Sequence, residues 1–256
     1  MIIRLKAAAI AAAALGLFLL SVPEARGEEA LRMLVSNGMK APIDELHPKL
    51  ESAGGCPIEL KFNSTAGIRM QIEAGEEFDL TLITSEAIAD LVRQGKLSGD
   101  SRADLVRSEL GIGIRKGAAR PDIRTIEALK RTLLATKSIT YPQDGAGRGY
   151  VEKMFERMGI AANVQPKIML APSSGASTQN IVTGKADTVI TLYSEIVPVP
   201  GVEILGPLPG EFQYHIRFSG AVSAKSKHAV AAKAVISYLA GPSAMAALKA
   251  KGLDPY

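Results

Sequence analysis

The stretch that decides the fold covers residues 58–83 and reads IELKFNSTAGIRMQIEAGEEFDLTLI. Two short apolar runs, 58–62 and 78–83, lie on either side of a helical pattern at 66–74. Small and hydroxyl residues at 63–65 separate the first run from the helix, as expected where a strand leads into a helix N-terminus. The stretch therefore predicts a strand-helix-strand unit whose two strands lie parallel in one sheet.

The same alternation continues in both directions from this stretch. Further strands are expected at 31–35, 110–115, 138–141, 166–170, 188–192 and 218–223. Further helices are expected at 42–52, 85–94, 125–136, 148–158, 177–183, 228–239 and 242–251. This order predicts an α/β protein of two lobes, each a mainly parallel sheet flanked by helices, with two crossing strands as a hinge. We expect lobe I to contain residues 28–112 and 216–256, and lobe II residues 113–215.

The N-terminus has the layout of a secretory signal peptide. Arg4 and Lys6 precede an apolar, alanine-rich run over residues 7–20, and Ala25-Arg-Gly27 supplies small residues at a cleavage site after Gly27. The alternative is an uncleaved membrane anchor, which needs about 20 apolar residues. The run is shorter than that and ends near Pro23. The sequence predicts a signal peptide over residues 1–27 and a periplasmic protein.

Composition excludes several classes of function. The single cysteine, Cys56, cannot form an intramolecular disulfide and is expected to be structural. A formal net charge of +4, without a basic stripe interleaved with aromatics, does not indicate nucleic-acid binding. The three histidines, His47, His215 and His228, accompany neither a G-x-S-x-G motif nor a cluster of metal ligands. We therefore expect that the protein is not an enzyme, and in particular not a secreted hydrolase. We also expect it to bind no metal and no cofactor.

Four strand-to-helix junctions are rich in small and hydroxyl residues. They cover residues 36–38, 63–67, 143–149 and 173–178. Ligands of open parallel sheets lie beyond the carboxyl ends of the strands, where helix N-termini offer free N–H groups to anions. Each junction alone fits an ordinary helix cap or turn equally well. The junction at 143–149 lacks the spacing of a dinucleotide-binding loop. Together, the four junctions predict a site for a small anion between the lobes.

Three stretches carry a resemblance to a known family. They cover residues 62–83, residues 145–159 leading into 170–172, and residues 186–193, and a Tyr238-Leu-Ala-Gly-Pro242 pattern agrees with them. Here the chain resembles the periplasmic molybdate-binding proteins, within the type II periplasmic solute-binding proteins of ABC transporters. The resemblance implies a monomer that closes its lobes around a molybdate- or tungstate-like oxyanion. It also implies delivery to an inner-membrane ABC permease.

The resemblance also implies particular ligand contacts. Thr65 matches a ligand hydroxyl, Gly147 a backbone donor, Ala176 or Ser177 a second backbone donor, and Tyr193 a ligand hydroxyl. The family's ligand serine falls on Gly38, so Ser36 or Asn37 is expected to supply the missing donor. Arg148 either binds a carboxylate or phosphate in the cleft or lies on a solvated helix face. The candidate ligand-binding residues are Asn37, Gly38, Ser64, Thr65, Gly147, Arg148, Ala176, Ser177 and Tyr193.

Two alternatives keep the fold and change the function. Gly38 and Arg148 favour a small organic acid over a tetrahedral oxyanion, because a guanidinium makes two parallel bonds to a carboxylate. A ligand sensor that docks onto a receptor would use the same closing cleft. The sequence does not separate a sensor from a transport protein.

Overall fold

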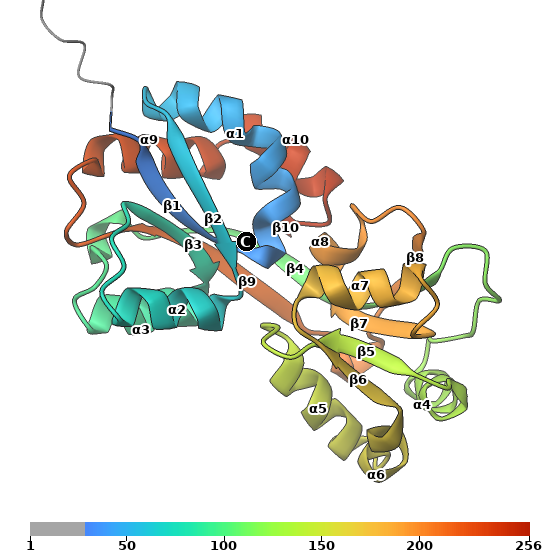
Figure 1. Cartoon of the computed structure of the whole chain (residues 1–256). Coiled ribbons are helices and arrows are strands. Elements are labelled where there is room, and N and C mark those ends of the chain that lie inside the picture. Colours follow the sequence, from blue (N-terminus) through green and yellow to red (C-terminus); the bar gives the residue numbers. More distant parts are fainter. Residues whose placement is uncertain (1–28) are drawn as a thin grey trace, which may run out of the picture.

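The computed structural model of the chain describes residues 29–256 (Figure 1). The predicted signal peptide lies outside these residues. The strands are β1 (Leu31–Ser36), β2 (Ile58–Asn63), β3 (Leu80–Thr84), β4 (Ala103–Arg115), β5 (Ile139–Pro142), β6 (Ile168–Ala171), β7 (Thr188–Leu192), β8 (Val202–Pro207), β9 (His215–Val222) and β10 (Asp254–Pro255). The α-helices are α1 (Lys40–Gly54), α2 (Thr65–Glu73), α3 (Ser85–Arg93), α4 (Ile126–Ala135), α5 (Arg148–Arg157), α6 (Ala161–Val164), α7 (Ser174–Val182), α8 (Tyr193–Ile196), α9 (Ala229–Ala240) and α10 (Pro242–Ala250).

The chain folds into two lobes. In lobe I, the order β2-β1-β3-β9 continues into the first half of β4, and β1 lies parallel to both β2 and β3. Helices α1, α9 and α10 cover one face of this sheet, and α2 and α3 cover the other (Figure 1). In lobe II, β7, β5 and β6 continue from the second half of β4, and β8 pairs with β4 on its other side.

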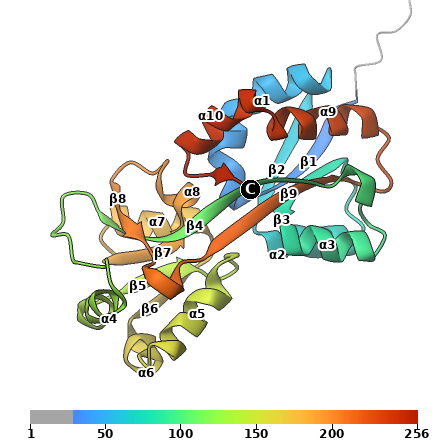
Figure 2. The ribbon, with the colours of Figure 1, turned by 180° about the vertical axis from the view of Figure 1, so that it is seen from behind.

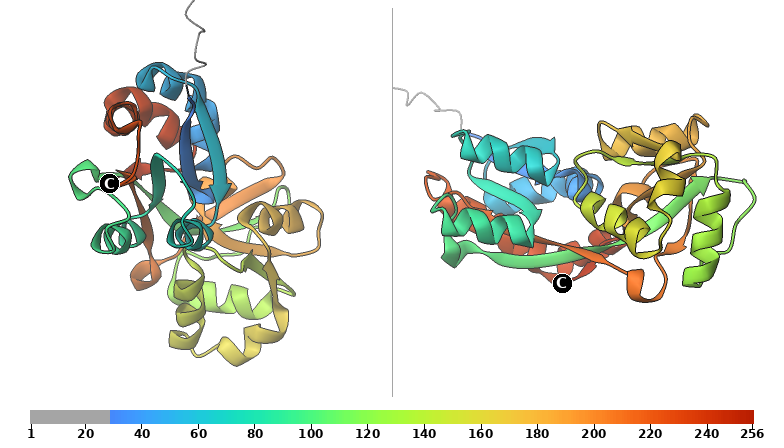
Figure 3. Two further views of the ribbon diagram at one scale, coloured as in Figure 1. Left: turned by 60° about the vertical axis from the view of Figure 1, so that its left-hand side comes forward. Right: turned by 90° about the horizontal axis from the view of Figure 1, so that it is seen from below.

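Two long strands connect the lobes, as Figure 2 and the right-hand view of Figure 3 show. Strand β4 pairs antiparallel with β9 as far as Glu109 and with β7 from Leu110 onward. Strand β9 also pairs antiparallel with β3, so it holds β4 against the lobe I sheet. The predicted pair of crossing strands is confirmed. The predicted residue limits of the lobes stay a prediction, and the change of sheet along β4 falls between Glu109 and Leu110.

Burial along the strands follows their place in the sheets. Every residue of β3 and β7 is buried, as expected for central strands covered on both faces. Strand β2 lies at an edge and alternates between buried and exposed residues. The largest apolar cluster is continuous from Met33 in lobe I, through Leu110 on the hinge, to Phe155 in lobe II. The two lobes and the strands that connect them therefore share one packed apolar core.

The structure differs from the sequence prediction at several elements, and α6, α8 and β10 are among those that were not predicted. Strand β4 begins at Ala103 rather than residue 110, because its first half alternates apolar and charged residues and was not recognised. Helix α7 begins at Ser174 rather than residue 177, and Ser173 is its N-cap. Strand β8 was not predicted, since it is only partly buried along its length. Within residues 29–256, no single helix is long and apolar enough to cross a membrane. Helices α9 and α10 reach the necessary length and hydropathy only when taken together, and the chain bends by 64° between them.

Candidate ligand-binding cleft

A cavity of about 80 Å³ lies between the lobes, where the carboxyl ends of their parallel strands meet. Five strand-to-helix junctions contribute to it, two from lobe I and three from lobe II. The lobe I lining is Ser36, Asn37, Asn63, Ser64 and Thr65. The lobe II lining is Pro142, Asp144, Gly145, Ala146, Pro172, Ser173, Ser174, Leu192 and Glu195. This is the place where an open α/β sheet is expected to bind a ligand.

The lobe I wall is organised around the N-terminus of α2. Ser64 is the N-cap, and its Oγ accepts a hydrogen bond of 3.0 Å from the N–H of Gly67. The preceding N–H groups, of Thr65 and Ala66, belong to the first helical turn and have no partner within the helix. The helix dipole adds a partial positive charge at the same point. This end of α2 can therefore donate to an anion without any charged side chain.

Thr65 also ties neighbouring strand ends together. Its Oγ1 lies 3.4 Å from Ser36 Oγ, at the end of β1, and accepts from the N–H of Thr84, at the end of β3, over 3.4 Å. Both distances are long for hydroxyl hydrogen bonds, so these contacts are weak. Weakly held hydroxyls can turn toward a ligand at little cost. Ser36, Ser64 and Thr65 thus supply the donors of this wall.

The lobe II wall repeats the arrangement with α7. Ser173 is the N-cap, and its Oγ accepts from the N–H of Ala176 over 3.1 Å. The N–H of Ser177 donates to Ser173 O, and its buried hydroxyl donates to Ser174 O over 2.7 Å. The two predicted donors, Ala176 and Ser177, are thus engaged within the helix. The N–H groups of Ser174 and Gly175 are the ones left over at its first turn.

The structure places the other predicted residues in three settings. Asn37 lines the main cavity, while Gly147 and Arg148 line a smaller recess of about 10 Å³ beside it. Arg148 already donates to Gln143 O over 2.7 Å and to Glu152 Oε1 over 2.8 Å. Its guanidinium therefore braces the loop before α5, at the edge of the recess.

Gly38 and Tyr193 lie outside the lining of both cleft cavities. Gly38 is buried, and a Cβ atom there would lie 2.6 Å from Phe218 Cζ and 3.0 Å from Leu192 Cδ1. A serine would not fit at this position without displacing the core. The ring of Tyr193 packs against Gly111 of β4, and burial raises the pKa of its phenol to about 12. Leu192, one residue earlier, faces the cavity instead.

Glu195 is a residue of the cleft that the sequence analysis missed. It is partly buried and lines both the main cavity and the recess. Burial raises the pKa of its carboxyl, against hydrogen bonds from the hydroxyls of Thr191 and Ser174 and the N–H of Leu192. The sequence signal that could have found Glu195 is its position just after the buried strand β7, at a strand-to-helix junction. Four other junctions of this kind were selected as candidate ligand sites. The sequence interpretation stopped two residues short of Glu195.

The charge of the cleft is unusual for an anion site. The main cavity is lined by two acids, Glu195 and the exposed Asp144, and its lining includes no lysine, arginine or histidine. Arg148 is confined to the adjoining recess. The neutral donors predicted from sequence are present, and an acidic side chain was not anticipated. An ionised Glu195 would add to the repulsion of an anion, whereas a protonated Glu195 would not.

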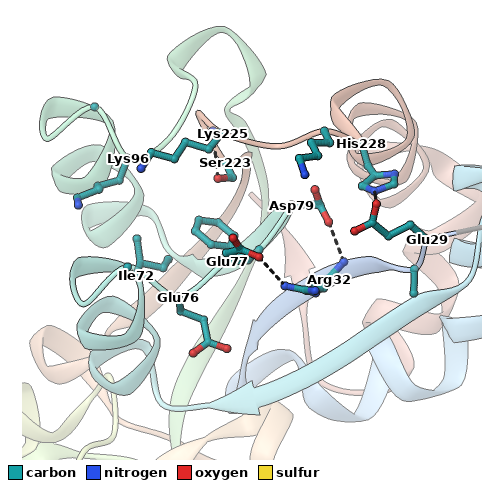
Figure 4. A pocket seen from close by; sticks show the side chains of 15 residues that line it. Glu29, Arg32, Ile72, Glu76, Glu77, Asp79, Lys96, Ser223, Lys225 and His228 are labelled. Atoms are coloured by element: carbon teal, nitrogen blue, oxygen red, sulfur yellow. Dashed lines mark hydrogen bonds and ion pairs between the residues drawn. The ribbon is translucent and has the colours of Figure 1, made fainter.

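A larger pocket of about 240 Å³ lies at the far end of lobe I (Figure 4). It forms beside the start of β1 and the loop before β3, at the amino ends of these strands. Its charged groups compensate one another: Arg32 pairs with Glu77 at 3.1 Å, and the Arg32 N–H donates to Asp79 over 3.0 Å. His228 lies 3.8 Å from Glu29. The N-cap of α9, His228, lines this pocket, but every lining residue belongs to lobe I, so the smaller cavity between the lobes is the better candidate.

A model of the family described as bacterial extracellular solute-binding protein matches residues 31–254. The chain belongs to this family. The solute-binding protein is 31% identical to aconitate isomerase of a Pseudomonas species, over 88% of this chain and 87% of the relative. It is 24% identical to the molybdate-binding protein ModA of Azotobacter vinelandii, over 87% and 88% of the two chains.

A solved structure gives the same fold. The periplasmic molybdate-binding protein of Azotobacter vinelandii superposes with a TM-score of 0.73 at 18% identity, covering 87% of this chain and 98% of that one. The predicted resemblance to periplasmic molybdate-binding proteins and the two-lobed type II fold are both confirmed. Among the described residues of this solute-binding protein, no group of three or more histidine, cysteine or acidic side chains could hold a metal ion.

Proposed function

We propose that the protein is the periplasmic solute-binding component of an ABC importer and captures a small anion in the cleft. One observation supports this most: the capped N-termini of α2 and α7 come from different lobes and line one cavity. An anion bound there would contact both lobes only when they close, so its differential affinity would shift the population toward the closed form. A membrane permease would recognise the closed form. In this proposal the mature protein is a monomer that begins at Glu28, after signal-peptide cleavage.

Within this class, a small carboxylate is the preferred ligand. Three observations favour it over molybdate or tungstate. The position of the family's ligand serine is occupied by Gly38, where the core leaves no room for a hydroxyl. A carboxyl group, Glu195, is part of the cavity wall, and an organic acid can share a proton with it. The 31% identical relative is named for aconitate, an unsaturated tricarboxylate.

Thermal unfolding of residues 28–256 with a panel of anions tests the proposal. The panel contains molybdate, tungstate, sulfate, citrate and the two isomers of aconitate. A ligand at about 100 times its Kd adds about 2.7 kcal/mol to the free energy of unfolding. For a protein of this size, that raises Tm by roughly 5–10 °C. A shift with a carboxylate supports the preferred ligand class, and a shift with molybdate alone transfers the proposal to oxyanions. No shift with any anion contradicts it.

A second candidate function is isomerisation of a bound unsaturated acid. The 31% identical relative carries this activity in its name, and the cleft holds a partly buried carboxyl group. Moving the double bond of aconitate requires that a proton leave the methylene carbon and that a proton return to the former vinyl carbon. A single carboxylate that accepts the first proton and delivers the second leaves no net change in atoms or charge. For this second function we infer that Glu195, in its ionised form, is the group that carries the proton.

Incubation of the purified protein with cis-aconitate tests the second function. Proton NMR in D₂O follows both the appearance of trans-aconitate and the exchange of methylene protons. If the protein is an isomerase, the wild type converts the substrate and Glu195→Gln does not. If the wild type binds cis-aconitate without conversion or exchange, the isomerase function is contradicted and only the transport function remains.

A further inference from the structure

The lobe II wall presents a carboxyl group to a cavity that is otherwise suited to an anion. Glu195 is reached by the hydroxyls of Thr191 and Ser174 and by the N–H of Leu192. These groups orient the carboxyl, and Leu192 lines the same cavity beside it. The carboxyl therefore has a defined position in the cavity wall.

We propose that Glu195 determines the specificity of the cleft by holding a proton, which it donates as a hydrogen bond to an oxygen of the bound anion. This inference rests on the proposed anion-binding function and adds that binding takes up one proton from solvent. No bond to carbon changes: the proton moves from water or buffer to a Glu195 oxygen, and it leaves again when the anion dissociates.

Like-charge repulsion is the physical reason. Two carboxylates that share a site cannot both remain ionised, and the pKa of one of them rises strongly. The same holds for a carboxylate next to an oxyanion. Burial already raises the pKa of Glu195 in the ligand-free protein, so protonation on binding requires little further change.

The surroundings of Glu195 offer no cation that would keep it ionised in the main cavity. From lobe I, the side chains that face it are neutral: Ser36, Asn37, Asn63, Ser64 and Thr65. From the loop before α5 comes Asp144, a second acid, which is exposed. Beside the recess lie Arg148, which is paired with Glu152, and Tyr141, whose pKa is raised to about 12 by burial. On its own helix, Tyr193 faces Gly111 and Glu109.

The consequence for ligand choice is specific. A neutral carboxylic acid is both a donor and an acceptor, so the cleft accepts an anion oxygen opposite Glu195 and also tolerates a ligand that carries its own proton. The protonated Glu195 therefore sets the pH range in which the cleft binds anions.

Calorimetric titrations with molybdate and with tricarballylate, the saturated analogue of aconitate, test this from about pH 7 to about pH 9. Above the pKa of Glu195 in the free protein, the wild-type affinity should fall with rising pH, approaching tenfold per pH unit. In Glu195→Gln, the carboxamide N–H₂ donates the same bond without a titrating proton. This variant should bind with an affinity that does not change over the same range.

Matched measurements separate the outcomes. Titration at one pH in buffers of different ionisation enthalpy should show proton uptake by the wild type and none by Glu195→Gln. Asp144→Asn, which removes the other acid of the cavity, should keep the pH slope. A flat wild-type profile, or a slope that persists in Glu195→Gln or disappears in Asp144→Asn, overturns the inference while the anion site stands. Failure of both anions to bind at any pH overturns the proposed function itself.

Discussion

The lobe I wall and the lobe II wall of the cleft start from the same structure, a nine-residue helix whose N-cap is a serine. They differ in what surrounds it. Around α2 the side chains are neutral amides and hydroxyls, whereas around α7 there are two acids, a leucine and the loop braced by Arg148. In the proposed function, the shared part is what binds an anion. The part that differs would make lobe II select among anions, while lobe I supplies uncharged donors.

Closing the space between the walls should give the largest effect. Ala146 is exposed and lines the cavity, so Ala146→Trp places a bulky ring between α2 and α7. We expect the affinity for the anion found in the thermal panel to fall at least about a hundredfold, or about 2.7 kcal/mol. Isothermal titration calorimetry measures it. Val230→Trp, at a residue 86% exposed on α9, is the control and should bind like the wild type. Equal affinity of both variants would place the ligand elsewhere.

Restoring a serine at the first junction should damage the fold and gain nothing. In Gly38→Ser, the new side chain meets Phe218 and Leu192 inside the core. We expect a loss of about 1–3 kcal/mol in the free energy of unfolding, measured by urea denaturation. Gly149→Ser is the control, because a Cβ there has no atom within 4 Å, and it should cost far less. A Gly38→Ser protein with normal stability and tighter molybdate binding would show that this wall can be rebuilt as an oxyanion site.

Most helices and strands could be predicted from the sequence because each has its own local pattern of apolar and polar residues. The strand-helix-strand unit at residues 58–83 appears as predicted, with bounds shifted by one or two residues. The first half of β4 was missed because its partner is β9, more than 100 residues later in the chain. Alternating charged residues such as Asp104 and Arg107 look like a surface loop until that partner is known.

The candidate site was predictable in outline and not in detail. The serine-rich junctions predicted from sequence lie around one cavity, and Asn37, Ser64 and Thr65 line it. The donors of α7 were displaced because the helix begins three residues earlier than predicted, which moves its free N–H groups to Ser174 and Gly175. Glu195 was missed because the junction after β7 was followed only as far as Tyr193, two residues before it. The burial of Glu195 depends on α7 and on the loop before α5.

Removing the two serine caps tests whether the walls are equivalent. Ser64→Ala and Ser173→Ala each remove one acceptor, from Gly67 N–H and from Ala176 N–H respectively. We expect each to cost about 1 kcal/mol, lowering Tm by about 2–4 °C, and to weaken anion binding. Ser52→Ala, at an exposed serine late in α1, is the control and should be neutral. A marked effect on binding from one cap only would mean that the ligand uses one wall.

The smallest expected effect is a pH dependence of stability confined to lobe II. Because the folded-state pKa of Glu195 is raised, its contribution to stability is fully present below the ordinary pKa of glutamate. It is lost as the pH rises through the raised value. The side chain of Glu195→Gln cannot ionise. The free energy of unfolding of this variant should therefore rise relative to that of the wild type as the pH goes from acid to neutral. Urea denaturation at a series of pH values measures the difference, and parallel curves for the two proteins would contradict it.

The central claim is that one small anion is held between the two walls. A crystal structure of the protein with the best ligand of the thermal panel tests it most directly. We predict that ligand oxygens accept hydrogen bonds from N–H groups at the first turns of both α2 and α7, with Glu195 within hydrogen-bonding distance. A ligand bound instead in the larger pocket at the far end of lobe I, beside Arg32 and Lys96, would contradict this claim. A ligand held by one wall of an open cleft would also contradict it.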